Sequence, residues 1–86
     1  MKKVGEVTDV EKREIEYYFE RSNGIEELLL ILDTKDELYR KATEELNELK
    51  QQMEHWWRNM SLKYRWESSV ESSWSIDFFT NNVFLV

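Results

Sequence analysis

The chain has 86 residues, no cysteine, no proline and a formal net charge of −6, and 35% of its residues are charged and 14% aromatic. This length supports one domain, the aromatic content argues against wholesale disorder, and the absence of cysteine excludes disulfides and thiol catalysis and fits a reducing, cytoplasmic location. The acidic balance disfavours nucleic acid as a partner, because phosphate contacts need a basic surface.

Residues 1–7 are expected to form a loose arm, with Val4 and Val7 laid along the core. The opening Met-Lys-Lys is typical of the start of a secretory signal, but acidic and polar residues follow at once, so we expect no such segment. The longest apolar run, residues 28–32, is far too short to span a membrane.

The first predicted helix covers residues 9–32. Thr8 followed by Glu11 matches a capping box. One helical face is indicated by residues at steps of three and four: Ile15, Tyr18, Ser22, Ile25, Leu29 and Leu32. A break at Asn23-Gly24 is the alternative, but a break normally resets the phase of the pattern, and here the phase continues. We therefore predict one helix, weakened at Gly24 by roughly 1 kcal/mol relative to Ala.

The second predicted helix, residues 35–64, is the longest element and organises the chain. It contains no Gly or Pro, and Thr34 with Glu37 fits a second capping box. Its apolar face carries Tyr39, Ala42, Leu46, Leu49, Met53, Trp56 and Met60. Asp33-Thr34 leaves room only for a tight turn, so the two helices are predicted to form an antiparallel αα-hairpin.

Residues 65–73 are polar and serine-rich, and we interpret them as a connection. Residues 74–86 predict a β-hairpin, because Trp74-Ser-Ile-Asp-Phe alternates with period two and Asn81-Asn82 suits a two-residue turn. This turn pairs Phe78 with Leu85 and Phe79 with Phe84. The inner face would then carry Trp74, Ile76, Phe78, Val83 and Leu85. A lone hairpin is marginal in water, so it should dock on the open end of the helical hairpin.

The predicted fold is thus mostly α, an α+β arrangement of a long antiparallel αα-hairpin with a docked C-terminal β-hairpin. It would bury a thin core and leave apolar side chains uncovered: Tyr17, Leu28, Leu38, Trp57, Phe79, Phe84 and Val86. Contiguous apolar surface of this kind marks a protein contact. We therefore expect a homo-oligomer, a dimer formed through the long helices or the β edge.

No residue pattern indicates catalysis, and we expect no metal or cofactor. The only histidine, His55, has no metal ligand at helical spacing and is interpreted as a solvated surface residue. The many glutamates lie on the faces of the predicted helices that are expected to be exposed to solvent. The serines of residues 68–73 have no histidine near in sequence to activate them.

Four tryptophans close together in sequence are the unusual feature: Trp56, Trp57, Trp66 and Trp74. With the interleaved Arg58, Lys63 and Arg65 they could stack on a nucleic-acid single strand. We favour a small core at the open end of the helical hairpin, with Trp57 or Trp66 as the exposed anchor for a protein partner. The predicted partner-binding residues are Trp57, Tyr64, Trp66, Phe79 and Phe84.

Four segments carry a family resemblance: K-V-G-E-V-T-D-V-E-K-R-E-I, F-E-R-S-N-G-I-E-E-L-L, W-W-R-N-M-S-L-K-Y-R-W-E and W-S-I-D-F-F-T-N-N-V-F-L. They resemble the CXXX-repeat modification system proteins, small bacterial proteins encoded with radical-SAM maturases and cysteine-repeat precursor peptides. The resemblance implies an accessory role beside an enzyme and transfers no active-site residues. Family members often carry a helix former where this chain has Gly24, which supports a continuous helix there. Without cysteine, the chain is not the precursor itself.

We therefore expect a non-catalytic, cytoplasmic binding component of a peptide-modification system, which grips a radical-SAM maturase or a cysteine-repeat precursor. Acidic helix faces would steer a basic partner toward an aromatic end that anchors it. The alternatives are a phage- or mobile-element-type regulator that binds and masks another protein, a purely self-associating structural protein, and an enzyme.

Overall fold

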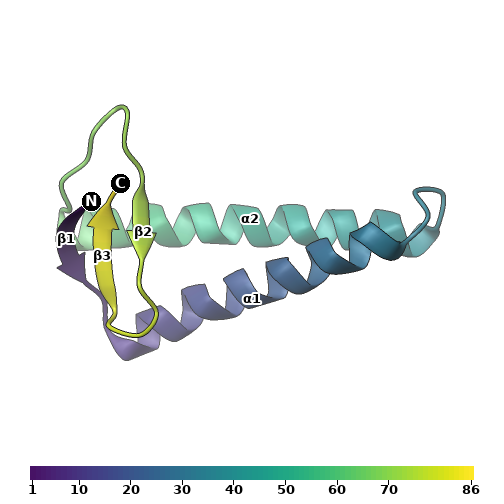
Figure 1. The fold of residues 1–86 in the computed structure, drawn as a ribbon, viewed down its shortest axis with the longest axis horizontal. Helices are drawn as coiled ribbons and strands as arrows, with labels where there is room; N and C mark the ends of the chain where they lie inside the picture. Colours follow the sequence, from purple (N-terminus) through teal and green to yellow (C-terminus); the bar gives the residue numbers. More distant parts are fainter.

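The computed structural model describes all of residues 1–86 and contains two helices and three strands. In chain order these are β1 (Lys2–Glu6), α1 (Asp9–Ile31), α2 (Glu37–Tyr64), β2 (Trp74–Ile76) and β3 (Asn82–Leu85). The helices form an antiparallel hairpin that holds 59% of the residues, and the strands cross one face of it at its open end (Figure 1). The predicted fold class is therefore confirmed, with one more strand than expected.

Helix α1 begins where the sequence indicates. The Thr8 hydroxyl accepts a hydrogen bond from the Glu11 amide (3.2 Å), and the Glu11 carboxylate accepts one from the Thr8 amide (2.9 Å), which completes the predicted capping box. The helix continues through Gly24 without a break. The predicted continuity is confirmed, since a single phase lets Ile15 and Ile25 both face α2.

Helix α2 begins two residues later than predicted, and Thr34 is not its cap. Asp36 fills that position, and its carboxylate accepts a hydrogen bond from the Leu38 amide (2.9 Å). The Asp33 side chain accepts one from the Lys35 amide (2.9 Å), which folds the connection into a turn of its own. The linker is therefore longer than the predicted tight turn, because the side chains of Asp33 and Asp36 each accept a backbone hydrogen bond that holds this segment outside the helix.

The N-terminal residues form a strand, so the prediction of a loose arm is wrong. The sheet is antiparallel with the order β1-β3-β2, and β1 pairs with the last strand of the chain, Lys2 lying opposite Leu85. Pairing satisfies backbone groups of β3 that an isolated β-hairpin would leave open. Val7, which follows β1, is buried in the core as expected.

The predicted β-hairpin is present, but the register predicted for its two strands is wrong. Trp74 lies opposite Leu85 and Ile76 opposite Val83, because the turn between the strands spans residues 77–81 rather than two asparagines. Asn81 takes the left-handed backbone conformation (φ 61°) that Asn tolerates. The shift is four residues, an even number, so each side chain stays on the predicted face.

The buried side chains form two clusters along the hairpin. The first, at the sheet end, contains Val7, Ile15, Trp56, Trp66 and Val83. The second, toward the helix–helix turn, contains Ile25, Ala42, Leu46 and Leu49. Both predicted helical faces are thereby confirmed. The radius of gyration, 15.1 Å, exceeds the ~12 Å of a compact domain of this length, and the molecule measures 43 × 28 × 21 Å.

Candidate functional site

Aromatic rings gather where the sheet meets the helices. Trp57 of α2 lies 6.1 Å from Trp66 and 6.5 Å from Trp74 of β2, between ring centroids, and Trp66 lies 6.0 Å from Trp74. Tyr64 stacks on Trp66 at 5.6 Å with the ring planes 8° apart. The small aromatic core predicted at the open end of the hairpin is therefore present.

Trp66 is not an exposed anchor, contrary to one of the two sequence predictions. Its side chain is buried, with 7% of the residue exposed. Strand β1 covers it: a Cβ atom added at Gly5 would stand 2.4 Å from the Trp66 indole nitrogen, so only glycine allows this approach. The burial of Trp66 was not predicted, because residues 1–7 were expected to form a loose arm and not a strand that covers this ring. Trp57 is half-buried and keeps part of its ring open to solvent.

Phe79 and Phe84, the other predicted contact residues, lie away from this cluster. Phe79 is fully exposed in the turn between β2 and β3. Phe84 is half-buried in the central strand, opposite Lys3 on one side and Ser75 on the other. The structure thus brings Trp57, Tyr64 and Trp66 together but not these two phenylalanines, whose role in binding stays a prediction.

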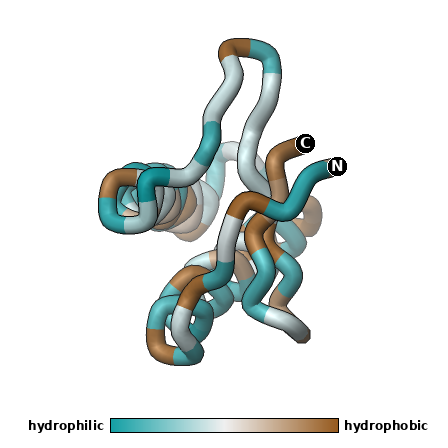
Figure 2. Tube along the Cα trace, turned by 90° about the vertical axis from the view of Figure 1, so that its left-hand side faces the viewer, coloured by the Kyte–Doolittle hydropathy of each residue, from teal (hydrophilic) through white to brown (hydrophobic).

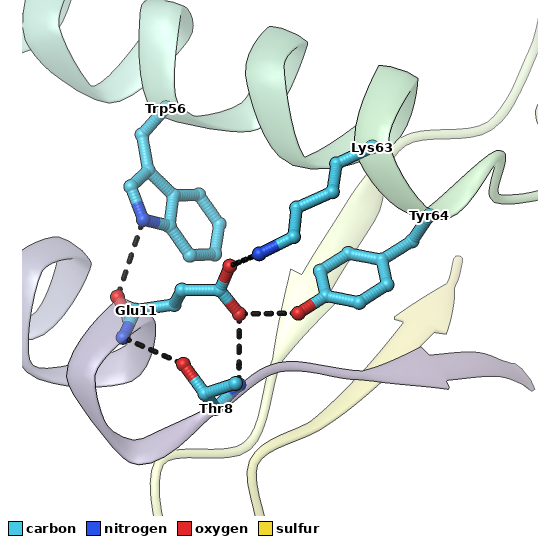
Figure 3. Close-up of polar contacts among 5 residues, drawn as sticks. All are labelled: Thr8, Glu11, Trp56, Lys63 and Tyr64. Atoms are coloured by element: carbon cyan, nitrogen blue, oxygen red, sulfur yellow. Dashed lines mark hydrogen bonds and ion pairs between the residues drawn. The ribbon is translucent and has the colours of Figure 1, made fainter.

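A polar clamp closes the same end of the helical hairpin (Figure 3). The Glu11 carboxylate accepts hydrogen bonds from the Lys63 ammonium (2.6 Å) and the Tyr64 hydroxyl (2.5 Å), in addition to the one from the Thr8 amide. The Trp56 indole N–H donates to the Glu11 carbonyl oxygen (3.2 Å). One residue at the start of α1 therefore holds three side chains from the end of α2.

The clamp fixes the charge of Glu11. Burial acts to raise the pKa of this carboxylate, but hydrogen bonds from Lys63, Tyr64 and Thr8 outweigh it and lower the pKa from 4.5 to about 2. The hydrogen bond to Glu11 in turn raises the pKa of Tyr64. A carboxylate this acidic, with its oxygens already engaged, is a poor general base at neutral pH. The arrangement serves to join the two helices.

An apolar pocket of about 260 Å³ opens beside this core, at the junction of β2 with both helices. Its lining comes from α1 (Ile15, Phe19), α2 (Met53, Trp57) and the β2 segment (Trp74, Ser75, Ile76, Phe78). Phe19 is 46% exposed, and its ring centroid lies 5.6 Å from that of Phe78. The pocket is thus a solvent-accessible extension of the core, lined by apolar groups except at Ser75.

The backbone of β2 is unpaired on the side that faces this pocket. Ser73 exchanges two hydrogen bonds with Val86, at 3.0 and 2.8 Å, and the Asp77 amide donates to Asn82 (2.9 Å). In an antiparallel pair, alternate residues point their N–H and C=O groups toward the partner strand. The residues between these positions, Trp74 and Ile76, therefore direct theirs to the free edge.

The two edges of the sheet differ in protection. At β1, Lys2 forms an ion pair with Glu67 (2.8 Å) and Lys3 with Glu6 (2.7 Å), and the register shifts between Lys3 and Gly5. Lysines and bulges are the devices that keep other chains from pairing with an edge. Strand β2 is only three residues long, which limits pairing, but it has no charged residue and no bulge. The edge beside the apolar pocket is therefore the one open to another strand.

A second, polar groove of about 550 Å³ runs between the helices and includes His55. His55 is exposed, as predicted. The groove also contains Glu14 and Glu48, and the Tyr18 hydroxyl donates a 3.4 Å hydrogen bond to Glu14. Nowhere do three His, Asp or Glu side chains come close enough to hold a metal ion.

Sequence reasoning missed Phe19, Met53 and Phe78 as residues of a solvent-accessible site. Phe19 follows Ile15 by four positions, so the helical period alone could have placed it beside the buried face. Met53 and Phe78 were expected in the core, and the pocket depends on where β2 stops covering them. Where this cover ends depends on the order of the strands in the sheet, and a hydrophobic pattern within one segment does not reveal that order.

Neither helix contains a stretch long and apolar enough to cross a lipid bilayer. Comparisons with protein-family models, curated proteins and solved structures found no match to this chain.

Proposed function

We propose that this protein is a non-catalytic accessory protein that holds another polypeptide at the free edge of β2. One observation carries the proposal: an apolar pocket open to solvent lies directly beside an edge strand that has no charged residue and no bulge. Apolar side-chain pockets next to unpaired backbone groups are the two components of strand-addition peptide recognition.

The lining of the pocket favours a polypeptide over a small polar substrate. Its only side-chain hydroxyl is that of Ser75, and it contains no charged group. Sites for small polar molecules fix them with several convergent polar side chains. Here the polar groups on offer are the backbone N–H and C=O of Trp74 and Ile76, which complement another backbone.

The partner class follows from the family resemblance in the sequence. It implies a cytoplasmic peptide-modification system, with a radical-SAM maturase or a cysteine-repeat precursor peptide as the polypeptide held. The net charge of −6 supports steering of a basic partner toward the site.

The experiment is an affinity pull-down of the tagged protein from its native cytoplasm, read by mass spectrometry. We expect the wild-type protein to recover a radical-SAM enzyme or a cysteine-repeat peptide, and Phe19→Ala to lose most of it. Tyr17→Ala is the matched control, because Tyr17 is an exposed aromatic residue of the same helix (62%) outside the pocket. Recovery of the protein alone would contradict the proposal.

Self-association is a second candidate, favoured by a separate observation. At the turn between the helices, Leu30 and Ile31 are 86% and 81% exposed. Large apolar side chains this exposed favour a protein contact. If the protein dimerises there, the double substitution Leu30→Ser/Ile31→Ser should convert dimer to monomer in sedimentation equilibrium. A wild-type protein that is monomeric across the concentration range would remove this candidate.

A further inference from the structure

We infer that the β2 edge accepts a single extended segment, antiparallel to β2, with apolar residues at alternate positions. The inference rests on the proposed function, because it names the chemistry of the polypeptide held there. It is carried by the direction of the free backbone groups, by the position of the pocket and by the place of the helices beneath the edge.

The free backbone groups fix how the segment pairs. Trp74 and Ile76 each offer one N–H and one C=O, so a partner strand can form two hydrogen-bonded residue pairs with β2. Both existing pairings in the sheet are antiparallel, the arrangement that gives the slightly more stable ladder. The recognised motif is therefore short, because β2 has only three residues and Ser75 is already engaged with β3.

The pocket fixes which side chains the segment carries. Trp74 and Ile76 both line the pocket, so residues paired opposite them point toward the same side, over the helices. Those residues are two positions apart in the segment and meet Phe19, Met53 and Trp57. The residue between them lies on the Ser75 side, which is exposed to solvent. The pattern is apolar–polar–apolar.

The helices exclude a second copy of this protein from the edge. In Figure 1, α1 and α2 continue past β2 for most of their length, and Figure 2 shows the sheet on one side of both helices. Two β2 strands paired antiparallel would be related by a two-fold axis normal to the sheet. That axis places both helical hairpins in the same layer, where they would overlap. A single extended segment has no helices packed beneath it, so its pairing with β2 causes no such overlap.

Capped synthetic peptides test the inference. The probe has isoleucine and phenylalanine separated by one serine and flanked by lysines, and its control has the same composition with the two apolar residues adjacent. Amide hydrogen exchange followed by NMR reports the bound backbone. We expect the alternating peptide to protect the Trp74 and Ile76 amides and to bind about tenfold more tightly than the control.

Methylation of single peptide nitrogens separates backbone pairing from general apolar binding. A methyl group on the phenylalanine nitrogen removes a donor that faces β2, and affinity should fall about tenfold. A methyl group on the central serine nitrogen, which points away from β2, should change it little. Equal losses from both, or no protection of Trp74 and Ile76 by any peptide, would overturn the inference.

Two further outcomes separate this inference from the proposed function. If the pull-down recovers a partner that Phe19→Ala loses, but the Trp74 and Ile76 amides exchange as fast in that complex as in the free protein, backbone pairing is wrong and the accessory role at this site stands. If the pull-down fails while the alternating peptide binds as described, the edge binds extended segments and the accessory role is wrong. Protection of both amides that rises with protein concentration alone would show that a second copy occupies the edge.

Discussion

Glu11 shows how one side chain can join the cap of a helix to its neighbour. Its carboxylate completes the capping box with Thr8 and at the same time accepts hydrogen bonds from Lys63 and Tyr64. The sequence identified the first role, because it depends on residues three positions apart. The second joins residues more than fifty positions apart, which no local pattern reveals.

Replacing Glu11 with Gln should lower the free energy of unfolding by roughly 2 kcal/mol at pH 7, since charged hydrogen bonds are lost in a partly buried site. The folded pKa, about 2, lies below the ordinary 4.5, so the ionised carboxylate stabilises the fold above pH 4.5. That stabilisation is lost as the pH falls from 4.5 toward 2. Urea unfolding of both proteins across this range should therefore show their stabilities converging. If the stabilities of the two proteins instead change in parallel with pH, the ionised Glu11 carboxylate is not the cause of the difference between them.

The two glycines should respond in opposite directions to the same substitution. Gly24→Ala should raise stability by roughly 1 kcal/mol, because its added methyl meets no atom within 4 Å and alanine favours a helix. Gly5→Ala should lower it by about 1–3 kcal/mol, because the methyl would press on the buried Trp66 indole. Thermal unfolding of the two variants checks both signs. A destabilised Gly24→Ala would indicate a role for the glycine beyond the helix.

At the scale of elements, the helices were predictable and the strands only partly so. Each helix repeats its apolar period over many turns. Helix α1 also has an unambiguous cap, so its predicted bounds agree closely with those in the structure. Strand β1 is five residues long and interrupted by Gly5, so it offers too little alternation to stand out. The β2–β3 register depends on turn length, and two adjacent asparagines favour a shorter turn than the one present.

The start of α2 gives a test at this scale. Asp36→Ala should cost about 1 kcal/mol, because the Leu38 amide loses its acceptor at the helix N-terminus. Thr34→Ala, two residues away, should leave stability unchanged within error, although the sequence alone favours Thr34 as the cap. Denaturant unfolding of both variants decides between them, and a larger loss at Thr34 would place the helix start where the sequence pattern does.

Of the residues predicted to bind a partner, only Trp57 lines the candidate site. Trp57 was expected to contact a partner, and the structure places it in the wall of the pocket. Trp66 was expected there too and is buried instead, because β1 returns to cover it. The free edge itself arises from the order β1-β3-β2, which joins the two ends of the chain and leaves β2 outermost.

On the scale of the whole molecule, the two core clusters lie at different distances from the sheet and share only Tyr18. All four tryptophans belong to or pack against the sheet-end cluster. Their fluorescence therefore reports that end of the molecule, whereas far-UV circular dichroism reports both helices along their length. The two signals together distinguish local from global unfolding.

Leu46→Ala should weaken the cluster near the helix–helix turn by about 3 kcal/mol. We expect its helical signal to begin to fall at a lower urea concentration than its tryptophan fluorescence, while the two transitions coincide in the wild-type protein. Asn47→Ala, an exposed substitution one residue along the same helix, serves as the control. Coincident transitions in Leu46→Ala would show that the hairpin unfolds as one unit.

The position of β3 sets the order in which the molecule can assemble during synthesis. Both outer strands pair only with β3, the last element of the chain, so β1 waits unpaired while the ribosome makes everything between them. Both helices precede β2 and β3 in the chain, so the helical hairpin can form before β3 is made. The wall of the apolar pocket formed by β2 is completed after that, when β3 leaves the ribosome. The surface proposed to hold another polypeptide is therefore complete only after β3 has been made.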